Sequence, residues 1–370
     1  MAGCFTRRGA LPELAAPSAA VTLAGQFSIP SGRRFPEITG LPFGGISALV
    51  ANPGASGELF GVSDAQRGRR IYRFAIQRAG SSFSVSTVGV TFLAAPPDDP
   101  NPADFEGLAI LPDGAVLISS EGSGREPRRP PSIAQYGAYG EFVRNLPVRD
   151  RYVPEVIGPL TKGARGNAGF ESLASTPDGS LFTAVETALV QDGDPANFDH
   201  GARTRVLEYK RRHGGFEPAR EFVYELDALQ RPGFAPGFYI NGLVELLVVD
   251  SATLLALERG YVEALGDPST GMNHIRLYRV SLTGATDVSQ LDSIKGRSGI
   301  VPVRKTLVLD LSSTAGLDKD LAPSLDNFEG MAFGPRLPDG RPTLILVSDD
   351  NFSPRQRTWF LEFAIGSGAR

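Results

Sequence analysis

The sequence predicts an all-β protein, a single β-propeller of four-stranded antiparallel blades, and two observations support this fold. The first is composition: 43 Gly and 29 Pro among 370 residues indicate a chain that turns often and argue against a helical bundle. The second is a sequence pattern that occurs five times, in segments that begin at Phe43, Phe105, Phe170, Ile240 and Phe328. A repeated unit of short strands is typical of a propeller blade.

Each repeat predicts its strands in the same order. The first strand carries the repeated motif, as in Phe105-Glu-Gly-Leu-Ala and Phe328-Glu-Gly-Met-Ala. In three repeats the next turn is Pro-Asp-Gly, at Pro112, Pro177 and Pro338, which is the chemistry of a hairpin turn. We expect second strands at 59–64, 116–121, 181–186, 254–258 and 344–349. Third strands are expected at 71–74, 133–136, 206–209, 275–280 and 359–363, and fourth strands are visible at 84–90, 141–146 and 220–226.

The number of blades is less constrained than the architecture. Five repeats are readable, but the long interval between Gly242 and Gly330 leaves room for a sixth blade around 284–311, where 305–311 is an unassigned strand. The last repeat reaches the C-terminus after its third strand, so the segment 21–29 is expected to supply its outer strand and close the ring. Residues 1–20 are then a tether, and residues 21–370 form the propeller domain.

Charge and cysteine content exclude several classes of function. The 37 basic and 41 acidic residues nearly cancel, so no nucleic acid partner is expected. Cys4 is the single cysteine, which rules out an intramolecular disulfide and a cysteine-based metal cluster. The run Met1-Ala-Gly-Cys4 fits the end of a bacterial lipoprotein signal, and the alternative is a cysteine there by chance. No apolar run is long enough to span a membrane. We expect a monomer in the periplasm, cell envelope or extracellular space, with a lipid anchor at Cys4 as one option.

Acidic residues recur at two positions of the repeat. Just before the glycine-like position the repeats carry Glu106, Glu171, Asn241 and Glu329, with Gly44 in the first. The second strands end in Asp64, Glu121, Glu186, Glu258 and Asp349. Carboxylates crowded at one mouth of the channel raise one another's pKa, and a hard cation with many oxygen ligands relieves that repulsion. The two rings therefore predict a calcium site, and the alternative is that each acid binds backbone amides of the next blade.

Basic residues accompany these acids in the connecting loops. The candidates for binding an anionic substrate are Lys162, Arg125, Arg165, Arg259 and Arg357, because guanidinium groups match phosphate or carboxylate oxygens. The alternative for each is a solvated charge or an ion pair with the acids. His200, in a long polar loop, is the best candidate by residue type for a general acid or base, against the alternative of an ordinary surface histidine.

The motifs together resemble a known family. Asp104-Phe-Glu-Gly-Leu-Ala, Gly169-Phe-Glu-Ser-Leu-Ala with Pro177-Asp-Gly, and Asn327-Phe-Glu-Gly-Met-Ala with Val347-Ser-Asp-Asp-Asn-Phe are similar to bacterial phytase-like proteins described by esterase-like activity. The resemblance runs from about Gly40 to Phe363. It implies an exported β-propeller, named by analogy to calcium-dependent phytases. Gly44 departs from the pattern, where other repeats have Glu, and so argues against a fully symmetric metal ring.

From these observations we expect a hydrolase of a phosphate ester or a related ester. A calcium ion would activate water at the channel mouth, Glu106, Glu171 and His200 would be the catalytic residues, and the basic residues would orient a small anionic ester. Two alternatives stay open. One is a calcium-dependent lactonase-like propeller, and the other is a propeller that binds a ligand or protein without catalysis.

Overall fold

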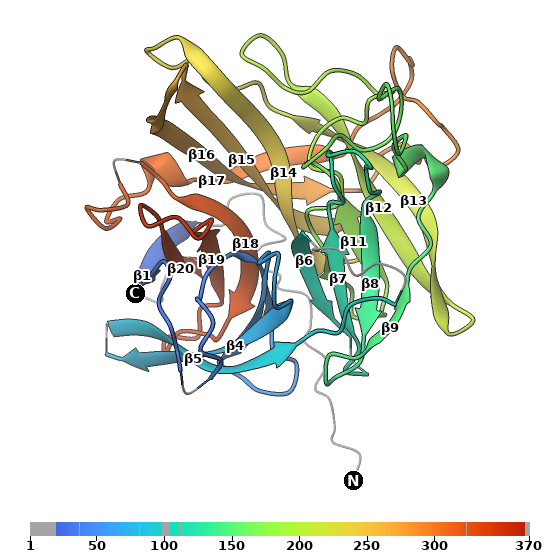
Figure 1. Cartoon of the computed structure of the whole chain (residues 1–370). Coiled ribbons are helices and arrows are strands. Elements are labelled where there is room, and N and C mark those ends of the chain that lie inside the picture. The colour runs from blue at the N-terminus through green and yellow to red at the C-terminus, as the bar shows by residue number, and fades with distance from the viewer. Residues whose placement is uncertain are drawn as a thin grey trace.

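The computed structural model describes residues 20–36, 38–80, 82–97, 104–111, 113–322 and 324–366. Over these residues the chain forms twenty strands and two short 3-10 helices, η1 (Asp150–Tyr152) and η2 (Leu311–Ser313). The strands form five four-stranded sheets arranged in a ring, which confirms the all-β propeller (Figure 1). Within the described residues there is no helix long and apolar enough to cross a membrane. Cys4 and the predicted tether up to residue 19 lie outside them.

Each sheet is one blade, numbered here in chain order from the innermost strand outward. The first blade is β2 (Ile46–Ala51), β3 (Glu58–Ser63), β4 (Arg70–Ala79) and β5 (Ser82–Phe92). The second is β6 (Phe105–Ile110), β7 (Val116–Ser120), β8 (Ser132–Tyr136) and β9 (Phe142–Asn145). The third is β10 (Ala174–Ser175), β11 (Leu181–Ala184), β12 (Ala202–Arg212) and β13 (Gly215–Leu226).

The last two blades differ from the others in strand length and in chain order. The fourth is β14 (Pro236–Asp250), β15 (Thr253–Ala264), β16 (Asp267–Ser281) and β17 (Arg304–Asp310). The fifth is β18 (Asn327–Gly334), β19 (Thr343–Asp349), β20 (Arg357–Ile365) and β1 (Val21–Pro30). The strand at Arg304–Asp310 pairs with β16, so it is the outer strand of the fourth blade. The sixth blade considered from the sequence is therefore absent from the described residues.

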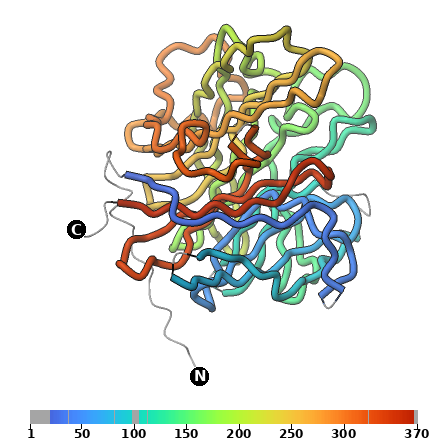
Figure 2. The backbone as a smooth tube through the Cα atoms, turned by 90° about the vertical axis from the view of Figure 1, so that its left-hand side faces the viewer, coloured from blue at the N-terminus to red at the C-terminus, as the bar shows by residue number. Residues whose placement is uncertain are grey.

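The ring closes through the N-terminal strand, as predicted. Strand β1 pairs antiparallel with β20, from Val21 opposite Ile365 to Pro30 opposite Arg357. Figure 2 shows this blue strand lying alongside the red C-terminal strands. At the centre the inner strands contact one another in sequence, β2 with β6, β6 with β10, β10 with β14, β14 with β18, and β18 with β2. The fifth blade thus joins the two ends of the chain.

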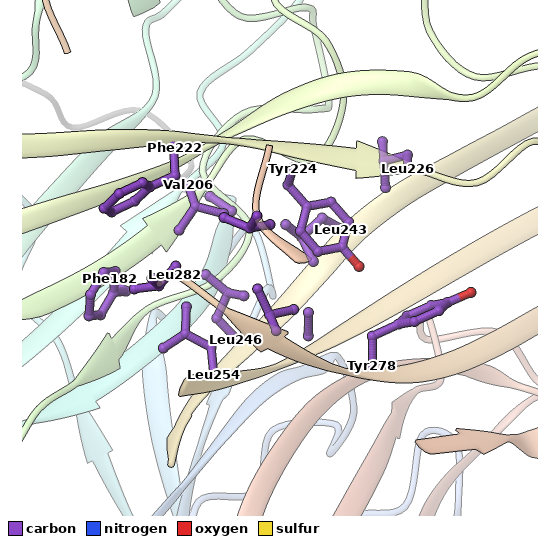
Figure 3. Close-up of a cluster of buried hydrophobic side chains, with 14 of the residues drawn as sticks. Phe182, Val206, Phe222, Tyr224, Leu226, Leu243, Leu246, Leu254, Tyr278 and Leu282 are labelled. Atoms are coloured by element: carbon purple, nitrogen blue, oxygen red, sulfur yellow. The ribbon is translucent and has the colours of Figure 1, made fainter. Parts of the chain in front are cut away.

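Apolar side chains fill the space between neighbouring blades. Figure 3 shows one such cluster, in which Phe182, Val206 and Phe222 of the third blade face Leu246 and Leu254 of the fourth. Each of these side chains is almost completely buried. Strands that alternate inward and outward side chains can bury such a layer on the face that meets the next blade. Packing between sheets, with almost no helix, therefore holds the ring together.

The Pro-Asp-Gly turns form as their residue types predict. In the third blade the Asp178 carboxylate accepts a hydrogen bond from the Ser180 backbone amide at 3.1 Å, and Gly179 has a φ of +80°. The same bond joins Asp339 to the Arg341 amide in the fifth blade, again at 3.1 Å. Aspartate fixes the turn through its own backbone, and glycine supplies the positive φ. In the second blade Asp113 and Gly114 repeat this arrangement, although Pro112 itself lies outside the described residues.

Close approach of the inner strands makes one glycine difficult to replace. A Cβ on Gly107 would lie 2.4 Å from the backbone nitrogen of Leu173 in the next blade. We expect Gly107→Ala to lower the free energy of unfolding by about 1–3 kcal/mol, because the two inner strands must separate. Gly233→Ala, where no atom lies within 4 Å of the added Cβ, is the control. Equal melting temperatures for the two variants would contradict this expectation.

Candidate functional site

A cavity of about 720 Å³ opens at the end of the channel where the inner strands begin. All five blades contribute to its lining. The residues nominated from the sequence that line it are Asp64, Glu106, Glu121, Arg165, Glu171, Glu186, Arg259, Glu329 and Asp349. They come from the starts of inner strands, the ends of second strands and the loop before β10. The repeat therefore places both acidic positions at the same mouth of the propeller.

A β-bulge explains how an acid of the inner strand reaches this mouth in the second and fifth blades. In the fifth blade Phe328 pairs with Ser348 and Gly330 pairs with Val347, so Glu329 between them is unpaired. An extra residue of this kind re-aims its side chain relative to the regular ladder. In the second blade the regular pairing is likewise interrupted between Phe105 and Leu108, where Glu106 lies.

The same bulge corrects the sequence alignment of two repeats. In the first blade the unpaired residue is Ser47, between Ile46 and Ala48, and in the fourth blade it is Val244, between Leu243 and Glu245. The alignment that used Gly44 and Asn241 is therefore three residues too early in both blades. The shift arises because Gly45 and Gly242 match the motif glycine of the other repeats but lie three residues before its structural position. Only three blades place a carboxylate at the bulge.

The fourth blade also differs at the end of its second strand. Leu243 pairs with Glu258 as Phe328 pairs with Ser348, so Arg259 is the residue that corresponds to Asp349. Arg259 lines the cavity and Glu258 does not. The ring at this level consists of four carboxylates and one guanidinium group.

Six nominated residues lie outside the cavity lining: Arg125, Lys162, His200, Asn241, Glu258 and Arg357. Glu258 accepts a hydrogen bond from the Tyr224 hydroxyl at 2.7 Å and forms an ion pair with Lys305 at 2.5 Å. The Asn241 side-chain amide donates to the Asp227 carbonyl at 2.8 Å. Both residues therefore belong to a polar network between the third and fourth blades.

The other four residues are held or exposed elsewhere. Lys162 pairs with Asp150 at 2.6 Å on the surface, and the Arg357 guanidinium donates to Ser28 at 2.9 Å. Arg125 is exposed. The exposed His200 ring contacts the Asn197 side chain at 3.0 Å, and it is Asn197, not His200, that lines the cavity. The structure thus does not bring these four side chains to the acidic group.

Burial raises the pKa of several carboxyls in the cavity lining. The pKa values of Glu106 and Glu171 lie well above the ordinary range, first because of burial and next because of neighbouring carboxylates. Burial raises the pKa of Glu186 to about 7, although Arg259 lowers it in part. Without a cation, several of these groups hold protons near neutral pH.

Three carboxylates come close enough to share one cation. Oxygen atoms of Asp104, Glu106 and Glu121 lie within 4.8 Å of one another. Two more oxygens of the cavity lining, Asp64 Oδ1 and Asn327 Oδ1, are buried without a hydrogen-bond partner. Carboxylate and amide oxygens in this number suit a hard cation such as Ca²⁺ better than Zn²⁺. The residues present therefore fit a calcium ion.

Arg259 is held across the cavity by acids from two other blades. Its Nη2 lies 3.1 Å from Glu186 Oε1 and 3.4 Å from Glu329 Oε1. Its Nε is buried without a hydrogen-bond partner. A guanidinium group fixed by two carboxylates keeps its charge and its orientation. It can offer the remaining N–H to an anionic ligand.

Glu245 is a buried carboxylate of the inner strand of the fourth blade. It lies one residue beyond the bulge of the fourth blade, and its carboxylate accepts the Leu246 amide at 3.0 Å. It also accepts hydrogen bonds from the backbone amides of Leu173 and Met331 in the neighbouring blades. One side chain thus satisfies amides from three inner strands. Glu245 therefore links the inner strands of the third, fourth and fifth blades.

Sequence reasoning left several cavity residues without a role. Asp104 and Asn327 occupy the position directly before the Phe-Glu-Gly motif, so the polar residue there was a usable signal. Thr187 follows Glu186 and also lines the cavity. Phe238 and Tyr239 lie on the part of β14 that extends beyond the ring, and no repeat predicts that extension.

Fold and site together define a five-bladed propeller with an acidic cavity at one mouth of its channel. Residues 41–352 match the phytase-like family described by "esterase-like activity of phytase". The chain belongs to this family, as the resemblance of its motifs predicted. The family description fits a hydrolase.

Solved structures show more distant likenesses. A glycosyl hydrolase from Bacteroides ovatus is 10% identical, with 95% of this chain and 93% of that chain covered and a TM-score of 0.40. A putative gluconolactonase is 16% identical, with 85% and 73% covered and a TM-score of 0.31. A mannose phosphorylase from Leishmania mexicana is 9% identical, with 93% and 84% covered and a TM-score of 0.33. Scores this low say nothing of activity. A search of the curated proteins gives no significant match.

Proposed function

We propose that this protein hydrolyses a phosphate ester or a related ester with water activated by a divalent cation, calcium foremost. The observation that carries the proposal is the group Asp104, Glu106 and Glu121, whose oxygens lie within 4.8 Å of one another in a cavity lined by further acids. Crowded carboxylates of this kind are stable as anions only with a cation among them. Membership of the phytase-like family supports hydrolysis as the reaction class.

Each cavity residue has a role in this proposal. Asp104, Glu106 and Glu121 would hold the cation, which lowers the pKa of a bound water molecule and neutralises developing negative charge when present. Glu171 is hydrogen-bonded to Glu121, and in the ionised form, which a cation held by the neighbouring carboxylates would favour, it could accept a proton from water. Arg259 would bind an anionic oxygen of the substrate through its unpartnered Nε. Glu171, and not His200, is therefore the general base in this proposal.

The proposal includes an exported, monomeric protein. Export is what the family resemblance implies. The N-terminal strand β1 completes the fifth blade, so the ring closes within one chain and the fold needs no second copy. Size-exclusion chromatography with light scattering tests the monomer, and fractionation of the native cells tests export.

Calcium dependence of hydrolysis tests the reaction. We expect the purified protein to release p-nitrophenol from p-nitrophenyl phosphate or p-nitrophenyl acetate in calcium, and to lose this activity when a chelator removes the metal. Glu121→Gln should abolish the activity because it removes a charged ligand from the group. Glu217→Gln, at an exposed carboxylate in β13, should leave it unchanged and is the matched control.

Three outcomes would contradict the proposal. Turnover that survives both chelation and Glu121→Gln would show that no metal at this site takes part. Calcium-dependent opening of a lactone, with no activity on either ester, would place the protein in the lactonase-like class instead. Raised melting temperature in calcium without turnover on any of these substrates would favour a binding propeller.

A further inference from the structure

An extended ribbon of the fourth blade forms one wall of the cavity. Strands β14, β15 and β16 reach beyond the ring, where Figure 1 shows them projecting past the other blades. Phe238, Tyr239 and Ile240 of this ribbon line the cavity together with Arg259. Phe238 is 53% exposed and Tyr239 is 39% exposed. Exposed aromatic side chains in a cavity wall indicate a surface that a ligand covers.

Strand pairing sets the distance between the aromatic wall and Arg259. Arg259 lies opposite Gly242, and the regular ladder from Gly242 to Phe238 keeps Ile240 and Phe238 on the same face. At about 3.3 Å per residue, Ile240 lies about 7 Å and Phe238 about 13 Å along the strand from Gly242. A ligand whose anionic group contacts Arg259 would therefore extend its next part over Ile240 and Phe238.

The loop between β11 and β12 of the third blade also lines the cavity, and it packs against the other face of the ribbon, at Tyr239. Phe198 of this loop packs on Tyr239, with ring centroids 4.6 Å apart, and the Arg231 guanidinium lies 5.7 Å from the Phe198 centroid. The same loop places Thr187 and Asn197 on the cavity. Thr187 Oγ1 is buried without a hydrogen-bond partner, and the residue is 2% exposed. The space beside Phe238 is thus bordered by the exposed ring of that residue and, within the same cavity, by the polar groups of this loop.

We propose that this space is a subsite for a sugar ring, so that the substrate is a sugar ester whose anionic group reaches Arg259 and the acidic group. A sugar ring offers a flat C–H face to the exposed ring of Phe238, which shares a face of the ribbon with Ile240 and Arg259. Its hydroxyl groups can form a hydrogen bond with Thr187 Oγ1. A plain aryl or alkyl group would leave that buried hydroxyl without a partner, which lowers the binding free energy that is gained. This inference rests on the proposed function for the position of the ester, but the subsite can be measured by binding alone.

Equilibrium binding of a matched pair of ligands tests the subsite. The probes are a hexopyranose phosphate and the corresponding straight-chain hexitol phosphate, titrated calorimetrically into the full chain in calcium. We expect the ring form to bind about tenfold more tightly, the upper range for favourable stacking on an aromatic side chain. Phe238→Ala should remove most of this preference. Tyr139→Ala, at a tyrosine 91% exposed outside the cavity lining, is the matched control and should keep it.

The outcomes separate this inference from the proposed function. Equal affinity for ring and straight-chain phosphates, absence of binding by both, or equal effects of the two variants would overturn the sugar subsite. A ring preference that depends on Phe238 without any hydrolysis would support the subsite and contradict the proposed reaction. Calcium-dependent hydrolysis of both phosphates at the same rate and affinity would support the proposed reaction and contradict the sugar subsite.

Discussion

Stripped of divalent cations, the protein is expected to lose stability as the pH rises from about 5 to about 8, and calcium is expected to reverse that loss. The cause is the set of carboxyls that line the cavity. Burial, and then their mutual repulsion, raises the pKa of Asp64, Glu106, Glu171 and Asp349 well above the ordinary range. These groups are easier to ionise in the unfolded chain than in the folded protein.

The sign follows from proton binding. Between the unfolded and folded pKa values the folded state binds more protons than the unfolded state, so the free energy of unfolding falls as the pH rises. For Glu186, whose pKa burial raises from 4.5 to about 7, the loss is about 3 kcal/mol once the pH has passed the folded value. The loss begins near pH 4.5 and is complete above about pH 7 for this residue. The other raised groups act in the same direction.

Calcium should oppose this loss because it binds the ionised form of the folded cavity. At a concentration roughly a hundredfold above its Kd, a single site adds about 3 kcal/mol to the free energy of unfolding. Urea unfolding at several pH values, with chelator and with calcium, measures both effects. Glu171→Gln should flatten the pH dependence of the chelated protein, and Glu217→Gln, at an exposed carboxylate, should leave it unchanged. Chelated protein that is more stable at pH 8 than at pH 5 would contradict the raised pKa values.

The sequence predicts the fold well because the same strand plan recurs five times. The motif at Phe105, Phe170 and Phe328 identifies the inner strands, and the acid that ends the second strand marks the mouth of the channel in every blade except the fourth. Residues such as Glu106 and Asp349 could be nominated because they are repeated. A repeat fixes position relative to the ring axis, and position alone brings their side chains together.

Departures from the repeat were harder to predict. In the first and fourth blades, glycines that precede the bulge shift the alignment of the repeats by three residues. The sequence pattern therefore does not identify Ser47 and Val244 as the bulge residues. Adjacent residues of a strand point to opposite faces of the sheet. The sequence pattern predicts Glu258 at the channel mouth, but Arg259, one residue later, occupies that position. Phe238 and Tyr239 lie on an extension that belongs to the fourth blade alone, and nothing repeated marks it.

The second large expected effect is the loss of a buried ion-pair network when Arg205 is replaced. Arg205 lies on β12 with no exposed side-chain surface. Its Nε lies 2.6 Å from Asp192 Oδ2, and its Nη1 lies 2.9 Å from Glu221 Oε2. Arg149 and Arg151, in the segment after the second blade, lie 3.4 Å and 3.5 Å from Glu221.

This network joins segments that are distant along the chain. Arg205 Nη1 donates to the Leu291 carbonyl at 3.0 Å, and Asp192 Oδ1 accepts the Ile294 amide at 2.9 Å. Both partners lie in the long loop between β16 and β17, which the sequence had suggested as a further blade. The guanidinium therefore holds that loop against the third blade. Its fork geometry makes the contacts simultaneously, which a lysine cannot do.

We expect Arg205→Met to lower the free energy of unfolding by about 3–5 kcal/mol, because Asp192 and Glu221 would remain buried without their main partner. Arg205→Lys should cost less than Arg205→Met but more than a surface substitution. The matched control is Arg203→Met, on the same strand, whose pair with Glu225 is 2.8 Å long but 41% and 47% exposed. An exposed pair contributes about 0–1 kcal/mol. Chemical unfolding monitored by tryptophan fluorescence measures the difference, and equal losses for the Arg205 and Arg203 variants would show that the network does not stabilise the fold.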